Sequence, residues 1–184
     1  MKRILNELQT LERKMKERFG DLVWLFPKVE SVKGYYGTGL CERYGKKVMF
    51  VAERPSRPSR GKLYRGGKSK QAIEMFYKAL KRLNLENAHL TDFIKTRARA
   101  GEWSYKDIKE NLAIFEEEFN VINPDVIITL GQNSFSWLSL YLIMKKSSLE
   151  PYKLKHYSQY RDVESYKDEF FKNLKEITKT FSIG

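Results

Sequence analysis

The sequence of 184 residues contains one cysteine, Cys41, and two histidines, His89 and His156. A single cysteine excludes a disulfide within the chain and a four-cysteine metal or iron–sulfur site. Two histidines also disfavour a metal site built from histidine ligands. We therefore expect a protein with no metal and no cofactor.

Long apolar segments are also missing. The N-terminal segment is too charged for a signal peptide, and no uninterrupted apolar run reaches transmembrane length. We expect a soluble, cytoplasmic protein without a membrane partner, acting as a monomer. A composition rich in Lys and Glu, with few Gln and Cys, is typical of a thermophilic source.

Acidic residues are outnumbered, with 23 Asp and Glu against 35 Lys and Arg, which gives a net charge of +12. Such an excess favours a polyanionic partner such as nucleic acid, although solubility alone also explains it. The imbalance is greatest over residues 54–70, where 7 of 17 residues are Arg or Lys and none is acidic. Like charges are costly to hold in a compact loop, so phosphate contact is favoured over a solvated loop.

This basic stretch contains Gly67-Lys68-Ser69, the ending of a nucleotide-binding P-loop. The P-loop pattern also requires a glycine five residues before its final glycine, and that position holds Lys62. An NTPase is therefore disfavoured, although the glycines and cations still suit another phosphate.

Apolar periodicity predicts helices that alternate with short strands. The helices are expected from about 3 to 19, from Ile73 to Leu83, from Ser104 through Ile108, Leu112, Phe115 and Phe119, through Trp137 and Leu140, and from Tyr166 to Phe181. The strands are expected at 46–53, 88–96, 124–131 and 152–159. This alternation predicts a three-layer α/β/α fold with a central four-stranded parallel sheet.

The chain shows no linker or repeat, so we expect a single domain over residues 1–184. Its parts are an N-terminal helix and extension (1–45), a motif-bearing core (46–161) and a C-terminal helix (162–184). Ligands of such sheets bind beyond the carboxyl ends of the strands. That rule selects residues 52–67, 91–103, 130–134 and 155–162, which also hold the unusual residues.

The order of motifs in these segments resembles the uracil-DNA glycosylase superfamily, particularly its branches in thermophilic bacteria and archaea. The family's Gly-Glu-Ala-Pro-Gly and Gly-Arg-Pro-Phe-x-Gly motifs are similar to residues 52–56 and 61–66. Its Thr-Asn-x-x-Lys strand, its Pro-x-x-Ile-x-x-Leu-Gly strand and its His-Pro-Ser segment with a downstream arginine are similar to 91–95, 124–131 and 156–161. The resemblance implies the α/β/α fold of that family.

The resemblance also implies a DNA glycosylase of base-excision repair, which hydrolyses the N-glycosidic bond of uracil or another altered base flipped out of DNA. His156 would donate to the pyrimidine O2, where negative charge develops, and Glu53 is the second candidate catalytic residue. The candidates for binding the base are Ala52, Arg54, Tyr64 and Asp92. The candidates for contacting DNA phosphates are Arg57, Arg60, Lys62, Arg65, Lys68, Gln132, Asn133, Ser158 and Arg161.

The sequence departs from the family pattern at several points, beginning with the missing iron–sulfur cysteines. Arg54 stands where other branches carry Asp, Asn, Ala or Gly, and an arginine cannot act as a base. Asp92 stands where an asparagine reads uracil. An ionised Asp92 only accepts hydrogen bonds and favours an exocyclic amino group, whereas a protonated Asp92 donates to O4. Tyr157 replaces the proline that follows the motif histidine.

Two alternatives to a glycosylase stay open. The first is a catalytically weak member of the same fold that binds DNA or a nucleotide, which is favoured by Arg54 with no clear base beside it. The second is a P-loop-like NTPase, which Lys62 disfavours. Two of the candidate site residues also have a structural interpretation. Tyr64 would pack beneath its loop, and His156 would cap its strand.

Overall fold

The computed structural model describes residues 2–19, 37–54, 67–95, 105–156 and 163–181. The helices of this part of the chain are α1 (Lys2–Phe19), α2 (Gly67–Arg82), α3 (Tyr105–Ile122), α4 (Gln132–Met144) and α5 (Val163–Thr180), with a 3₁₀ turn η2 at Glu42–Tyr44. The strands are β1 (Leu40–Cys41), β2 (Lys46–Ala52), β3 (His89–Asp92), β4 (Val126–Leu130) and β5 (Tyr152–Leu154).

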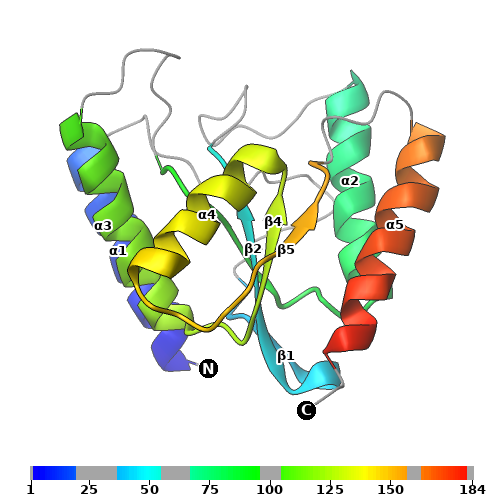
Figure 1. Cartoon of the computed structure of the whole chain (residues 1–184), viewed down its shortest axis with the longest axis horizontal. Helices are drawn as coiled ribbons and strands as arrows, with labels where there is room; N and C mark the ends of the chain where they lie inside the picture. Colours follow the sequence, from blue (N-terminus) through cyan, green and yellow to red (C-terminus); the bar gives the residue numbers. More distant parts are fainter. Residues whose placement is uncertain (1, 20–36, 55–66, 96–104, 157–162, 182–184) are drawn as a thin grey trace.

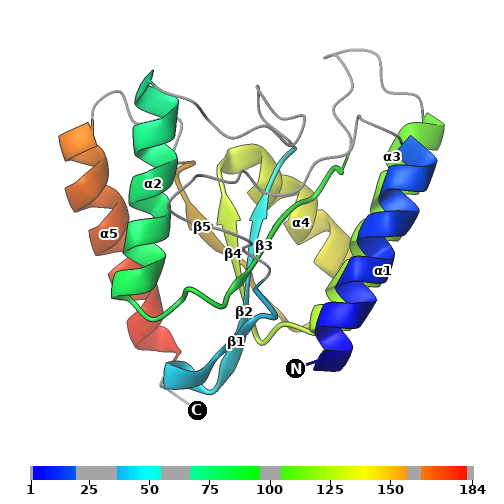
Figure 2. The ribbon, with the colours of Figure 1, turned by 180° about the vertical axis from the view of Figure 1, so that it is seen from behind.

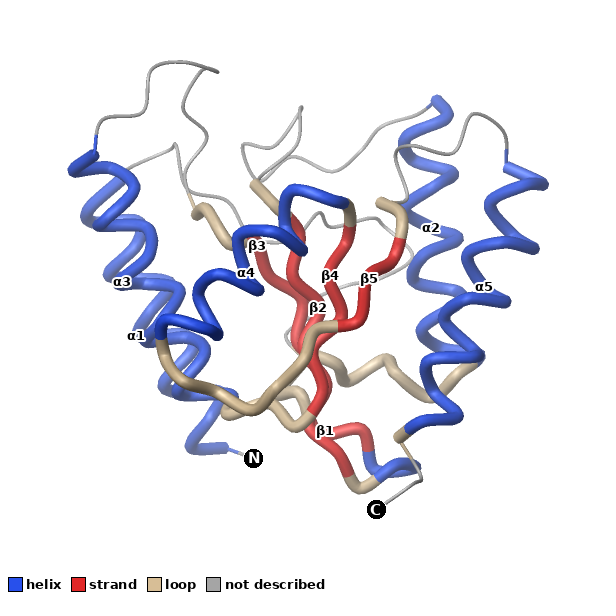
Figure 3. Tube along the Cα trace, viewed as in Figure 1, coloured by secondary structure: helices blue, strands red, loops and turns tan. Residues whose placement is uncertain are grey.

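Four strands run parallel in the spatial order β3-β2-β4-β5, which confirms the predicted sheet. The fifth strand, β1, pairs antiparallel with the start of β2. Figure 3 shows the strands side by side in the centre of the molecule. The sequence did not predict β1, because a two-residue strand is too short to carry an alternating pattern.

All four predicted strands are longer than the observed ones. The difference is largest for β3, which ends at Asp92, and for β5, which ends at Leu154. The amides of Phe93 and Ile94 still donate to the carbonyls of Ala52 and Glu53, at 2.8 and 3.0 Å. However, β2 ends at Ala52, so no regular ladder continues beside them. Helix α2 begins at Gly67, six residues before Ile73, where the apolar pattern predicts its start.

Helices cover both faces of the sheet. Helices α2 and α5 pack on one face, with Phe76, Leu80, Phe170 and Leu174 against Phe50 and other side chains of β2, β4 and β5. Helices α3 and α4 pack on the other face. Helix α1 packs alongside α3, as Figures 1 and 2 show from opposite sides. These layers confirm the predicted α/β/α fold.

Helix α3 packs its predicted apolar residues Leu112, Phe115 and Phe119 toward the sheet, but its most buried positions also include polar residues. Asn111, Phe115, Glu118 and Ile122 are buried, whereas the expected core positions Ile108, Leu112 and Phe119 are only partly buried. The buried face therefore includes two polar side chains, Asn111 and Glu118. Both accept hydrogen bonds from residues at or just beyond the end of β3.

Candidate functional site

The register of the sheet brings four strand ends to one level. Ala52 pairs with Asp92 on one side and with Leu130 on the other, and Leu130 pairs with Leu154. The residues just beyond this row, including Glu53, Gly131 and His156, therefore gather at the carboxyl edge of the sheet. The carboxyl ends of β2, β4 and β5 lie at the top of Figure 1.

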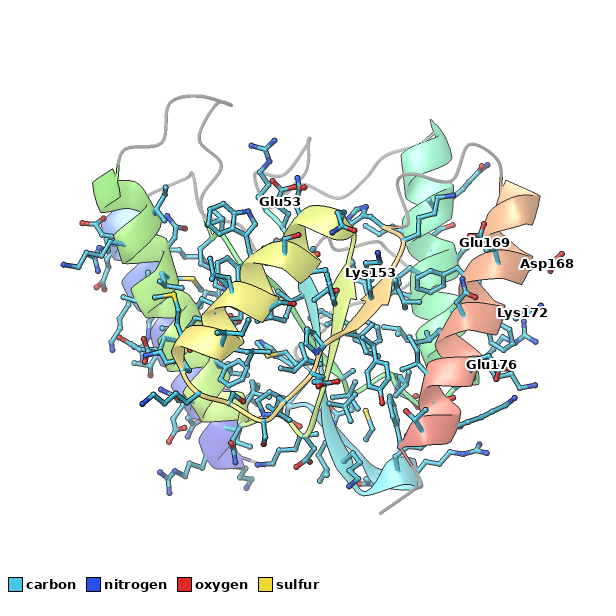
Figure 4. The ribbon with its side chains drawn as sticks, in the orientation of Figure 1. Glu53, Lys153, Asp168, Glu169, Lys172 and Glu176 are labelled. Carbon is cyan, nitrogen blue, oxygen red and sulfur yellow. The ribbon has the colours of Figure 1, made fainter. Side chains whose placement is uncertain are left out.

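Glu53 is held in place at this edge by a neighbouring helix. The side-chain amide of Asn133, in the first turn of α4, donates to Glu53 Oε2 at 3.0 Å. The Nε of Arg54 lies 3.7 Å from Glu53 Oε1, and the Glu53 side chain is about one third exposed. Figure 4 shows Glu53 beside the start of α4. A carboxylate with two partners and access to solvent is oriented but still able to contact water or a ligand.

Asp92 is buried at the same level, on the face of the sheet that also carries Ala52. Its carboxyl oxygens accept no hydrogen bond from any residue in the described part of the chain. Burial raises the pKa of Asp92 to about 7, with Lys95 opposing the rise and the carboxylates of Glu118 and Glu53 adding to it. A buried polar group without a partner is costly, and a ligand that hydrogen-bonds to this carboxyl would relieve that cost.

The main chain beside Asp92 is fixed by a buried polar network. The ammonium of Lys95 donates to the carbonyl oxygen of Asp92 at 2.6 Å and to the hydroxyl of Thr91, and it forms an ion pair with Glu118 of α3. Thr91 also donates to Glu118, at 2.7 Å. The side chain of Asn111 accepts from the amide of Lys95 at 2.7 Å. Helix α3 thus holds the end of β3 at two points.

His89 completes this network at the other end of β3. Its Nε2 lies 2.8 Å from a carboxylate oxygen of Glu118, and its Nδ1 lies 2.8 Å from the carbonyl oxygen of Gly37. His89 therefore links the carboxylate of Glu118 to the main chain of Gly37. Burial alone would raise the pKa of Glu118, but Lys95 and His89 outweigh it and hold that pKa at about 2. Glu118 is therefore ionised at neutral pH.

His156 lies two residues beyond β5 and against the turn between β4 and α4. Burial lowers its pKa to about 4, so the imidazole is neutral at neutral pH and carries one N–H donor. Gly131 adopts a positive φ of 100°, and a Cβ built there would lie 3.5 Å from the Cβ of His156. Glycine at this turn therefore meets a backbone requirement and leaves room for the histidine.

The predicted phosphate ligands Gln132 and Asn133 begin α4, but their side chains already have partners. Asn133 is bonded to Glu53, and Gln132 accepts a hydrogen bond from Lys153 of β5 at 3.0 Å. Lys153 is exposed and lies near the start of α4 in Figure 4. Sequence reasoning missed this cation, because one lysine in a short strand carries no signal of its own.

The remaining predicted site residues are outside the described chain, and their roles stay predictions. They are Arg57, Arg60, Lys62, Tyr64, Arg65, Ser158 and Arg161. Lys68 lies in the first turn of α2, but its side chain is also outside the description.

Sequence reasoning also missed the pairing of Lys95 with Glu118 and His89. One signal was present, because Glu118 follows Asn111 by seven residues and Phe115 by three, which places all three on one helix face.

Within the described ranges, no three His, Cys, Asp or Glu side chains gather in a way that would hold a metal ion. None of the helices in those ranges has the length and apolar character needed to cross a membrane.

The family model described as the uracil DNA glycosylase superfamily matches residues 38–177, which is about three quarters of the chain. The matched region begins just before β1 and ends within α5, so it includes every strand of the sheet. No curated protein sequence matches the chain.

The Lys95–Glu118 pair should be essential to stability. We expect Lys95→Met to lower the free energy of unfolding by about 3–5 kcal/mol, because it leaves a buried carboxylate without its cation. The matched control is Lys145→Met, which breaks the exposed pair with Glu116 and should cost about 1 kcal/mol or less. Urea denaturation of both variants measures the difference, and equal losses would contradict the assigned role.

Asp92 should make stability fall as pH rises. Its pKa is raised in the folded protein, so its contribution is greatest at low pH and is lost as pH rises through about 7. Relative to Asp92→Asn, the wild type should lose up to about 1.4 kcal/mol per pH unit between about pH 5 and 7. Denaturation of both proteins at each pH measures this difference. If the free energies of unfolding of the two proteins differed by the same amount at every pH, Asp92 would be ionised throughout the range.

Proposed function

The chain belongs to the uracil-DNA glycosylase superfamily, and we propose that it hydrolyses the N-glycosidic bond of an altered base in DNA. The observation that carries the proposal is the carboxyl of Asp92, which is buried without a hydrogen-bond partner in the described chain at the edge where sheets of this type bind ligands. DNA is the proposed partner, and a monomer is the proposed working form.

The two charge states of Asp92 would select different bases. An ionised carboxylate accepts hydrogen bonds only, so it favours a base with an exocyclic amino group, as in cytosine and related bases. A protonated carboxyl donates to a keto oxygen such as O4 of uracil. The pKa of Asp92 is raised to about 7 by burial, so both states would be present near neutral pH.

The proposed reaction breaks the bond between C1′ of the sugar and the base nitrogen, and the bonding electrons leave with the base. The base becomes negative at O2, and the N–H of neutral His156 would stabilise this charge more in the transition state than in the ground state. Water then forms a new bond to C1′, and its proton is lost. Glu53, which Asn133 orients, is the proposed group that positions this water and accepts the proton.

One observation favours a second candidate function, which is DNA binding without cleavage. The Glu53 carboxylate lies between the side chains of Asn133 and Arg54, and these partners compete with water for its oxygens. A protein with this function would bind DNA with a steep dependence on salt and would leave no abasic site.

Excision should depend on His156. In single-turnover assays on oligonucleotides with one uracil, hypoxanthine, cytosine or modified cytosine, alkali cleaves the strand at each abasic site formed. We expect His156→Ala to lower the rate on the preferred base by about 10²–10³-fold, the usual effect of removing one donor to a developing oxyanion. The exposed control Glu150→Ala should keep the wild-type rate. Wild-type DNA binding without abasic product on any base would favour the second function.

Base preference should change with pH. From pH 6 to 8 we expect uracil excision to fall, approaching tenfold per pH unit above about pH 7, while excision of cytosine-like bases rises. The pKa of His156, about 4, lies below this range, so Asp92 is the group that titrates. In Asp92→Asn the dependence should disappear and uracil should be preferred throughout. An unchanged pH profile in that variant would show that another group sets it.

A further inference from the structure

A basic pocket lies at the opposite end of the sheet from the candidate site. It has a volume of about 500 Å³ and lies between η2, the C-terminal end of α2 and the C-terminal half of α5. Figure 1 shows these elements at the lower right, below the carboxyl ends of the strands. The seven residues of β2 separate the two places, a distance of roughly 20 Å at the usual rise of a strand.

The described residues that line the pocket carry charge of one sign only. They are four cations from three elements, two aromatic side chains, a leucine and a threonine, with no carboxylate among them. The lining residues are Arg43, Tyr44, Arg82, Leu83, Phe171, Lys175, Thr178 and Lys179.

Three of these cations form no ion pair in the described chain. Lys179 forms an ion pair with Glu176 at 2.7 Å, and Lys175 also interacts with that carboxylate, but more weakly. The side chains of Arg43, Arg82 and Lys175 make no hydrogen bond or ion pair with any described residue. Figure 4 shows Glu176 projecting outward from α5. Unpaired cations that converge on a concave surface repel one another, and a bound anion relieves that repulsion.

The walls of the pocket are held in place before any ligand arrives. The guanidinium of Arg82 stacks over the ring of Phe171, with 4.2 Å from its Cζ to the ring centroid. The hydroxyl of Tyr44 donates to the carbonyl oxygen of Leu83 at 2.6 Å. The guanidinium is planar, and stacking fixes the orientation of that plane, which suits paired hydrogen bonds to phosphate oxygens.

Helix dipoles account for only part of this arrangement. Cations are favoured in the last turn of a helix, which explains Arg82 and Lys179. Lys175 lies a turn earlier in α5, and Arg43 belongs to the separate turn η2. Their convergence on the same pocket is therefore not explained by the dipoles of α2 and α5.

We propose that this pocket binds a phosphate group. The arginine forks of Arg43 and Arg82 would hold the phosphate oxygens, and Lys175 would supply further charge. The phosphate would come either from the backbone of DNA outside the candidate site or from a small phosphate-bearing molecule. The proposal does not depend on glycosylase activity, because no lining residue belongs to the candidate site.

The test replaces two exposed cations of the pocket, in the variant Arg43→Gln/Lys175→Gln. The matched control, Lys2→Gln/Lys109→Gln, removes the same charge from exposed positions on α1 and α3, across the sheet. Fluorescence anisotropy measures the affinity for an undamaged duplex over a range of salt concentrations. Nuclear magnetic resonance measures the shifts of the pocket amides when pyrophosphate is added. Thermal unfolding checks that each variant is folded.

We expect the pocket variant to reduce the slope of log affinity against log salt by about 1 to 2, since each phosphate contact contributes about 0.9. The control variant should reduce this slope by clearly less. A larger loss of slope in the pocket variant than in the control identifies DNA as the source of the phosphate. An unchanged slope, with pyrophosphate shifting the pocket amides of the wild type alone, identifies a small ligand instead. Neither effect in a folded variant would overturn the proposal.

Discussion

Lys95 and Glu118 form a buried ion pair that joins the end of β3 to α3, and the candidate site depends on this contact. The ammonium of Lys95 also holds the carbonyl oxygen of Asp92, so the pair determines where that residue lies. Because Glu118 has Lys95, Thr91 and His89 as partners, the network is satisfied without the carboxyl of Asp92. The result is one buried carboxyl left available at the carboxyl edge of the sheet.

Two neighbouring carboxyl groups thereby differ in character. Asp92 is buried and its pKa is raised to about 7, whereas Glu53 is partly exposed and bonded to Asn133. In the proposed function the two groups have different tasks, because Asp92 would read the base and Glu53 would position water. His156, neutral through burial, adds a donor from a third strand end.

Much of the fold could be predicted, because long amphipathic helices and compact apolar strands carry clear periodic signals. The predicted parallel sheet and its two helical layers are confirmed, and the strand ends that hold Glu53, Asp92 and His156 follow from that topology. Strand β1 was not predictable, because two residues form no pattern. The partners of Lys95 were not predictable either, because a buried lysine is rare and its pairing depends on the rotation of α3.

The most direct test of the proposed function identifies the released product. Oligonucleotides with one uracil or one cytosine-like base are incubated with the protein in ¹⁸O-labelled water at pH 6 and pH 8, and mass spectrometry follows the products. The account predicts a free base and an abasic sugar that carries one oxygen from solvent, with uracil released mainly at pH 6. DNA that is bound but yields no free base at either pH would contradict it.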